Sequence, residues 1–323
     1  MRRAATVLVA SSLAAGCTAD PQVRGTPSAV LPTPPVTGGS VAASPPDASD
    51  PAAPPEISVP PDEPVLALPD PDGWIPRDPR RLAEDLEATR IALGEAIGRW
   101  KRDGDPGSWP PPADVEVLAL HEQRIYRTLG RDERLAARVL SRLRGRPAAR
   151  ARANVRARAA LNLHQRPIPG PITMRVRRPE PADTLLDHLR EAESRFGVDW
   201  EVLAAVMLIE TRMGRVVSRS SAGAQGPMQF LPSTWDAYGM GGDVHEERDA
   251  ILGAANYLRA SGAPGDYRLA LYRYNPLRSY VTAVTAYASV MRRDPDAFYA
   301  YYNWQVFVRT RHRGDVRLSG PGR

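Results

Sequence analysis

The stretch VLAAVMLIE, residues 202–210, ends an apolar run on one carboxylic acid, Glu210. None of the residues before Glu210 in this run has a polar side chain, which predicts a helix buried on most of its sides. Asp199 stands where an N-cap residue would begin this helix, and Gly214 predicts its end shortly after Glu210. The sequence therefore predicts a buried helix that presents one acid at its carboxyl end.

Glu210 is expected to stay protonated to a higher pH than an ordinary glutamate. Leu203, Met207 and Glu210 recur at helical spacing, so the carboxyl shares a stripe with apolar side chains. Removal from water and the negative end of the helix dipole both raise the pKa of a carboxyl group. Such an acid suits proton donation to a glycosidic oxygen. The competing interpretation is a surface ion pair with Arg212 or Arg215.

A second informative segment, SSAGAQGPMQFLPSTW at residues 220–235, joins a glycine-rich turn to an apolar and aromatic stretch. Gly223 and Gly226 permit a positive φ or a close approach of another backbone. Gln229 offers both a donor and an acceptor, as sugar hydroxyl and N-acetyl groups require. An ordinary loop could carry any one of these residues, so their meaning depends on their combination with Glu210.

Taken together, these features resemble the lytic transglycosylase family of the lysozyme superfamily, in its soluble-lytic-transglycosylase type. The family signature is a Glu that closes an apolar helix, then a Gly-Ala-x-Gly-x-Met-Gln block that ends in Pro, then a Tyr-Asn pair. Glu210, the block Gly223–Pro232 and the pair Tyr274-Asn275 occur here in that order. The resemblance covers about residues 185–288 and rests mainly on the long middle block.

The sequence departs from the family pattern at three places. Thr211 replaces the usual Ser after the Glu and keeps a hydroxyl, whereas Pro276-Leu277 replaces the Ala-Gly that often follows the Tyr-Asn pair. Some membrane-bound members carry a calcium-binding loop, but the acidic residues here do not have EF-hand spacing. We therefore expect no metal and no cofactor, and interpret these residues as a polar loop and helix start: Asp243, His245, Glu246, Glu247 and Asp249.

The resemblance implies a mainly α chain with a lysozyme-like helical domain around a long cleft, and it implies a reaction. Glu210 would protonate the β-1,4 oxygen between N-acetylmuramic acid and N-acetylglucosamine in peptidoglycan. The same residue, now a carboxylate, would accept the proton of the muramyl 6-hydroxyl as that oxygen attacks C1. The product would be a 1,6-anhydromuramyl end, formed without water, and one carboxylate would do work for which ordinary glycosidases use two.

The resemblance also implies which residues bind the glycan strand. Ser220 and Gln229 match positions that contact the sugar near the cleaved bond, and Met228 matches the cleft floor. Tyr274 and Asn275 match the cleft wall beside the acid. For Met228 a purely structural role in the core is also expected. Four other aromatic residues could stack on sugar rings, although core packing is the commoner role for them: Trp235, Tyr238, Tyr272 and Tyr280.

Two further functions remain open at this point. A muramidase of the same fold would admit water and would need a second carboxylate, for which Asp243 and Asp249 are the nearby candidates. A non-catalytic peptidoglycan-binding protein would keep the cleft without turnover, and the presence of Glu210 counts against it.

The amino terminus indicates export. Basic residues at 2–3 precede an apolar segment that ends at Gly16 and is too short to span a bilayer. Ala14-Ala15-Gly16-Cys17 resembles the lipobox of bacterial lipoproteins, which implies cleavage after residue 16 and a lipid anchor on Cys17. The chain would then lie on the outer face of the cytoplasmic membrane, facing the cell wall. An ordinary secretory signal is the alternative. Cys17 is the single cysteine, which excludes an internal disulfide framework.

The 323 residues suffice for one large or two small domains, and composition divides them into successive segments. Helical periodicity outside the first stretch includes runs at 250–260 and 280–292. We expect a signal peptide at 1–16, a disordered Pro- and Ala-rich stalk at 17–71, a helical region of unknown role at 72–165, a Pro-rich linker at 166–181, the catalytic domain at 182–309 and a frayed basic tail at 310–323.

The charge balance favours anionic partners without choosing among them. There are 43 basic and 37 acidic residues, a formal net charge of +6, and export argues against nucleic acid. Seven arginines between 142 and 158 form a run without an acid between them, which favours a solvated helix face over contact with an anionic polymer or headgroup. The Arg-, Ala-, Pro- and Gly-rich composition indicates a GC-rich genome, and we expect an actinobacterial lipoprotein.

Overall fold

A computed structural model describes residues 67–318. Within this range the chain forms eleven helices and one two-stranded sheet, so the prediction of a mainly helical fold is confirmed. The predicted signal peptide, the lipidation site Cys17 and almost all of the predicted stalk lie outside the described residues. No helix in residues 67–318 is both long enough and apolar enough to cross a membrane.

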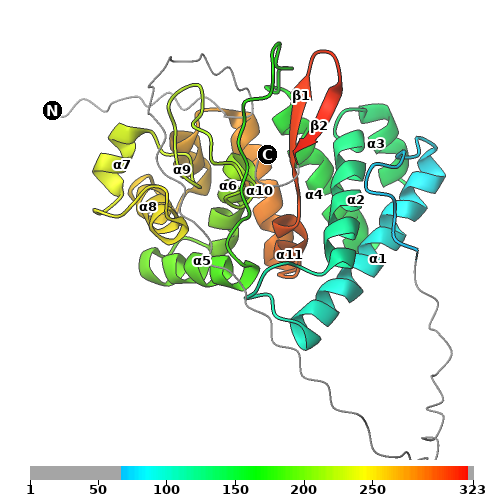
Figure 1. Cartoon of the computed structure of the whole chain (residues 1–323), viewed down its shortest axis with the longest axis horizontal. Coiled ribbons are helices and arrows are strands. Elements are labelled where there is room, and N and C mark those ends of the chain that lie inside the picture. Colours follow the sequence, from blue (N-terminus) through cyan, green and yellow to red (C-terminus); the bar gives the residue numbers. More distant parts are fainter. Residues whose placement is uncertain (1–66, 319–323) are drawn as a thin grey trace, which may run out of the picture. The chain divides into compact units, whose positions relative to one another are not determined.

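The helices fall into an earlier and a later group along the chain (Figure 1). The earlier group is α1 (Pro79–Asp103), α2 (Ala113–Leu129), α3 (Glu133–Leu140) and α4 (Gly145–Asn162). The later group is α5 (Ala182–Phe196), α6 (Trp200–Thr211), α7 (Pro232–Tyr238), α8 (Glu247–Ala260), α9 (Tyr267–Tyr274), α10 (Arg278–Arg293) and α11 (Ala297–Tyr302). The predicted helical runs at 250–260 and 280–292 correspond to α8 and α10.

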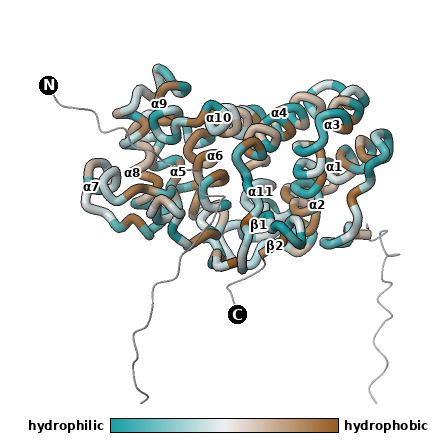
Figure 2. Tube along the Cα trace, turned by 90° about the horizontal axis from the view of Figure 1, so that it is seen from above, coloured by the Kyte–Doolittle hydropathy of each residue, from teal (hydrophilic) through white to brown (hydrophobic). Residues whose placement is uncertain are grey.

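Helix α6 is the central element of the later group. Every residue from Trp200 to Thr211 is buried, as the apolar sequence predicted, and α6 packs against α5, α8 and α10. Its apolar residues stand out as a brown segment in Figure 2. A helix that is apolar on all sides can be stable in water only when other helices surround it, so α6 fixes where its neighbours must lie.

Helix α10 joins the two groups, because one side packs on α6 and another packs along α4. Small side chains on α4 permit this close approach, since Ala148, Ala151 and Ala157 are buried. Residues from Leu68 onward form one compact unit whose buried apolar residues make a continuous cluster. The helices before the Pro-rich segment therefore share a core with the helices after it.

The arginine run on α4 is only partly a solvated face. Arg152 and Arg156 are exposed, as expected, but Arg158 is only 2% exposed and Arg150 is half-buried. Arg158 donates from Nη2 to Asn162 Oδ1 at 3.1 Å, and Arg150 pairs with the fully buried Glu122 at 3.0 Å. The solvated-face interpretation is thus wrong for Arg150 and Arg158, because the face that carries them packs against the rest of the unit.

The carboxyl end forms a hairpin that sequence reasoning missed. Strand β1 (Val306–Thr310) pairs antiparallel with β2 (Gly314–Leu318). Asp315 on β2 accepts from Arg127 at 2.5 Å and from Arg131 at 2.7 Å, which ties the hairpin to the end of α2 and the turn beyond it. The expectation of a frayed end is therefore wrong for residues 314–318.

The Pro-rich segment at 166–181 lies against the chain that follows α6. Val176 forms an antiparallel bridge with Val216, and Arg177 N donates to Arg215 O at 2.8 Å. The Arg177 side chain donates to Gly214 O at 3.4 Å and pairs with the buried carboxylate of Glu247. This segment consequently braces the turn at which α6 ends.

Candidate active site

Glu210 is held at the very end of α6, where it is only 6% exposed. The helix stops after Thr211 because Arg212, Met213 and Gly214 all adopt left-handed φ values, of 56°, 57° and 80°. Such values are costly for residues other than glycine. The strained turn must therefore be held by its surroundings, and the predicted end at Gly214 is confirmed.

The Thr211 hydroxyl supplies much of that support. It donates to Pro227 O at 2.6 Å and accepts from Gly214 N at 3.0 Å. One hydroxyl thus closes the turn after α6 and ties it to the loop at 220–231. A serine at this position would keep the same hydroxyl chemistry.

Burial raises the pKa of Glu210 from its usual range to about 7. The hydroxyl of Tyr280 opposes this shift, because a hydrogen bond to the carboxylate favours its ionised form. The contact is loose, since the Tyr280 hydroxyl and Glu210 Oε1 each lack a hydrogen bond of standard geometry within residues 67–318. The expected direction of the pKa shift agrees with the structure, and burial is its cause.

The competing interpretation of Glu210 as half of an ion pair is wrong. No ion pair joins it to Arg212 or Arg215 in the described part of the chain. The Arg212 guanidinium donates instead to Leu208 O, and Arg215 Nη1 donates to Arg212 O at 3.3 Å. Both arginines bond to carbonyl groups around the helix end, which leaves the Glu210 carboxyl without a cationic partner in residues 67–318.

Two tyrosines lie beside this carboxyl. Tyr274 ends α9 and Tyr280 lies in the first turn of α10, and their rings are stacked with centroids 6.4 Å apart. Burial, with Glu210 as the next cause, raises the pKa of both well above the usual range, so both hydroxyls stay protonated. Tyr274 donates to Met228 O at 2.6 Å. The described contacts therefore bring Glu210, Tyr274, Tyr280 and the Met228 backbone together.

Tyr280 has a role at the site beyond the core packing that its sequence context predicts. It is indeed only 2% exposed. Its second property, contact with Glu210, depends on how α10 packs across α6. The sequence gives a weak signal for this contact, because a tyrosine hydroxyl on a buried helix face needs a polar partner. It does not identify Glu210 as that partner.

The loop at 220–231 forms a tight turn under Glu210's helix end. Gln225 and Phe230 exchange two backbone hydrogen bonds, at 2.9 and 2.8 Å. Gly226 has φ +75°, and a Cβ there would lie 1.9 Å from Val244 O. Position 226 thus requires glycine both because of its positive φ and because the Val244 backbone leaves no room for a side chain. Gly223, at φ +83°, has open space around it.

Gln229 has two features of a binding residue. It adopts a left-handed φ of 52° although it is not glycine, and it is only 3% exposed. Its Nε2 donates to Gly226 O at 3.1 Å, while its Oε1 is buried with no hydrogen-bond partner within residues 67–318. Strain and an unused buried acceptor are typical of functional positions.

The other predicted binding residues have clear structural roles. Met228 is fully buried, so its side chain belongs to the core while its carbonyl receives the Tyr274 hydrogen bond. Asn275 is fully buried and its backbone N–H caps α9 by donating to Leu271 O at 2.9 Å. Ser220 Oγ accepts from Ala222 N and Ala224 N, at 3.2 and 3.0 Å. The Ser220 hydroxyl therefore stabilises its own turn.

The acidic residues before and within α8 do not approach Glu210 through any described contact. Asp249 Oδ2 accepts from Asp243 N at 2.9 Å, and Asp243 Oδ1 accepts from His245 N at 2.9 Å. These carboxylates hold their own loop in shape. No three side chains of His, Cys, Asp or Glu gather as a metal site would require in residues 67–318.

The glycine geometry predicts different effects for two similar substitutions. Gly223→Ala should lower the free energy of unfolding by about 1–2 kcal/mol, the cost of a left-handed alanine. Gly226→Ala adds a clash with Val244 O and should cost more than about 3 kcal/mol. Urea unfolding of the two variants measures this difference, and equal losses would mean that the Val244 backbone does not constrain the loop.

The pKa of Glu210 predicts a pH-dependent stability. Below pH 4.5 the Glu210 carboxyl is neutral in both the folded and the unfolded chain. Between pH 4.5 and about 7 the carboxyl is ionised in the unfolded chain but still neutral in the folded one. The free energy of unfolding therefore falls as the pH rises through this range. Glu210→Gln should therefore gain about 3 kcal/mol relative to the natural protein between pH 4.5 and pH 8. Urea unfolding across this range tests it; a constant difference would show that the carboxyl is not desolvated.

The chain is partly similar to a known protein. Over 130 residues the chain is 30% identical to a protein of Thiobacillus denitrificans named membrane-bound lytic murein transglycosylase F. The match covers 38% of this chain and only 27% of that relative's length. No family model and no solved structure matches. The chain thus spans about a quarter of that relative's length, and the similarity supports a relationship to the lytic transglycosylase family.

Proposed function

We propose that the protein is a lytic murein transglycosylase in which Glu210 acts first as acid and then as base. The bond cleaved is the β-1,4 bond between N-acetylmuramic acid and N-acetylglucosamine, and the product is a 1,6-anhydromuramyl end. The observation that carries the proposal is a buried carboxyl with a pKa of about 7 and no cationic partner in residues 67–318. A group with this pKa can both donate and accept a proton near neutral pH.

In the first step the neutral Glu210 carboxyl gives its proton to the glycosidic oxygen as the C1–O4 bond breaks. The positive charge that develops at C1 is stabilised by the carbonyl oxygen of the substrate's own acetamido group. Glu210 is left as a buried carboxylate, which is unfavourable without a partner. Tyr280 is placed to supply a hydrogen bond to that anion, because its hydroxyl already acts on the Glu210 pKa.

In the second step the muramyl 6-hydroxyl attacks C1, and its proton passes to Glu210. The new C1–O6 bond closes the anhydro ring and the enzyme regains its neutral acid. No water is consumed, so the site needs no second carboxylate to activate one. Gln229 is suited to hold the sugar during both steps, since its buried Oε1 has no hydrogen-bond partner in the described part of the chain. Ser220, Met228, Tyr274 and Asn275 complete the proposed glycan-binding set.

The contacts of Asp243 and Asp249 weigh against a muramidase. A hydrolytic enzyme would need one of them to hold water opposite Glu210, yet each accepts a backbone hydrogen bond within its own loop. Retention of a desolvated acid weighs against a protein that only binds peptidoglycan, because a buried carboxyl lowers stability at neutral pH.

Glu210→Gln tests the catalytic assignment. The amide keeps the size of the side chain but cannot give a proton to a leaving oxygen, so turnover should fall by about ten-thousand-fold or more. Mass spectrometry of digested peptidoglycan reports the anhydromuropeptides released. Asp243→Asn and Asp249→Asn serve as matched controls and should change turnover by less than about tenfold. An active Gln variant, or an Asn variant as inactive as Glu210→Gln, would exclude the single-acid mechanism.

We further propose that the mature chain is exported and anchored through a lipid on Cys17, with residues 182–309 as its catalytic part. The Ala14–Cys17 lipobox supports the anchor. Cys17→Ser should move the protein from the membrane fraction to the soluble fraction of lysed cells. Incorporation of labelled fatty acid into the natural protein gives an independent readout. A Ser variant that stays with the membrane, or an unlabelled natural protein, would contradict the anchor.

A further inference from the structure

A groove with a cavity volume of about 610 Å³ lies where α4, α9 and α10 meet. We call it the arginine groove. Its lining consists of Arg156 from α4, of Arg268, Leu269 and Tyr272 from α9, and of Arg278, Val281, Thr282 and Thr285 from α10. Three guanidinium groups from three separate helices therefore surround one cavity.

The charge of the arginine groove is uncompensated. Arg156, Arg268 and Arg278 are exposed, and none of them makes an ion pair or a side-chain hydrogen bond to another residue in 67–318. The lining contains no carboxylate. Each guanidinium carries five donors that are arranged to hold a carboxylate or phosphate in a two-pronged fashion. The arginine groove thus has the charge and the hydrogen-bond donors to bind an anionic ligand from outside the chain.

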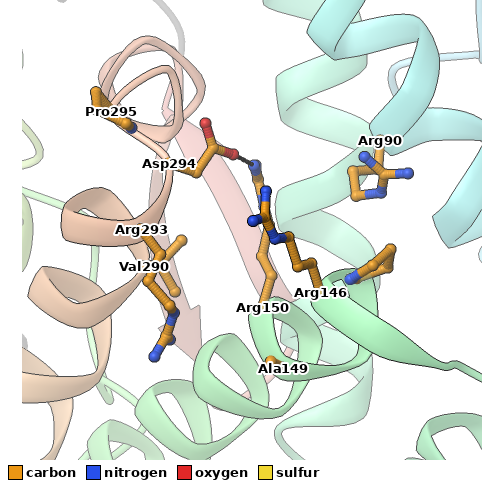
Figure 3. A pocket seen from close by; sticks show the side chains of 9 residues that line it. Arg90, Arg146, Ala149, Arg150, Val290, Arg293, Asp294 and Pro295 are labelled. Carbon is orange, nitrogen blue, oxygen red and sulfur yellow. Dashed lines mark hydrogen bonds and ion pairs between the residues drawn. The ribbon is translucent and has the colours of Figure 1, made fainter.

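A second arginine-rich pocket, between α1, α4 and α10, provides the contrast (Figure 3). There the Arg150 guanidinium bonds to Asp294 at 2.6 Å and to Glu122 at 3.0 Å. Arg90 pairs with Glu87 at 2.7 Å. Carboxylates of the chain itself neutralise much of this pocket, so its arginines have a structural explanation that those of the arginine groove lack.

The arginine groove lies close to the candidate active site. The residues of α10 at 278, 281, 282 and 285 share the groove face, whereas Tyr280 lies on the opposite, buried face of the same first turns. On α9, Tyr272 lines the groove and Tyr274 stacks on Tyr280. The groove and the tyrosine pair are separated by about one helix diameter, ~10 Å. The groove therefore lies across α10 from the tyrosine pair, at a distance that an extended peptide of a few residues can span from a strand bound at Glu210.

We propose that the arginine groove binds carboxylates of the peptides that peptidoglycan strands carry, and so holds the strand by its peptides while Glu210 acts. This inference rests on the proposed function. The apolar lining favours a peptide over a phosphate polymer, because Leu269, Tyr272 and Val281 can pack against aliphatic side chains. The clustering of the three arginines around one cavity also suits a compact anionic group better than an extended polyanion.

The test compares two triple variants, both built on Glu210→Gln so that binding is measured without turnover. The first replaces Arg156, Arg268 and Arg278 by Ala. The matched control replaces Arg142, Arg146 and Arg293, which are exposed arginines outside the groove, and loses the same charge. Binding is measured by pelleting with purified peptidoglycan sacculi, and with the same sacculi after an amidase has removed their peptides. Circular dichroism verifies folding, and the three single groove variants replace the triple variant if it unfolds.

The groove variant should bind intact sacculi at least about tenfold more weakly than the parent, whereas the control should lose less than threefold. On peptide-free sacculi the groove variant and the parent should bind alike. Equal losses in the two triple variants, or a groove-variant loss that persists on peptide-free sacculi, would overturn the proposal. A loss confined to purified teichoic acid would assign the groove to a phosphate polymer instead and would also overturn it. Because Glu210→Gln has no turnover, these results are independent of whether the natural protein forms anhydro products.

Discussion

The desolvated carboxyl of Glu210 is the interaction on which the rest of the account depends. The carboxylate form of this acid is poorly hydrated because the side chain is buried at the end of an apolar helix, and burial therefore raises the pKa of Glu210 to about 7. That position is kept by a turn in which three successive residues are left-handed. The Thr211 hydroxyl and the Arg177–Glu247 pair brace this turn from two directions. The buried carboxyl and the left-handed turn both lower the free energy of unfolding, and packing elsewhere in the fold must offset this loss.

The helices that precede the Pro-rich segment contribute to this packing. Helix α10 supplies Tyr280 to the acid on one side and rests along α4 on another, so the position of the tyrosine depends on α4. Polar contacts fix α4 among its neighbours: the Tyr301 hydroxyl on α11 donates to Asn154 Oδ1 at 2.8 Å, and Arg150 bonds both to Glu122 on α2 and to Asp294 at the end of α10. A region whose role the sequence leaves open is therefore physically part of the support for Glu210.

The local sequence pattern predicted those features of the fold and site that depend only on residues close together in the sequence. The apolar run, the glycine at its end and the direction of the Glu210 pKa shift all follow from residues within a few turns of one another. It failed where distant segments decide the outcome. Tyr280 reaches Glu210 only because α10 packs against α6, and the α4 arginines divide between core and surface because α2 and α10 cover one face of α4. The β1–β2 hairpin is held through Asp315 by Arg127 and Arg131, which lie far from it in the sequence.

The central claim is that the muramyl 6-hydroxyl, and not water, attacks C1, and digestion of purified peptidoglycan in oxygen-18 water tests it most directly. Mass spectrometry of the released muropeptides reports the end group and its label together. The account predicts anhydromuramyl ends that contain no oxygen-18 from the solvent, because no water enters the reaction. Reducing muramyl ends that carry one oxygen-18 atom would contradict it, because they would show that Glu210 activates water.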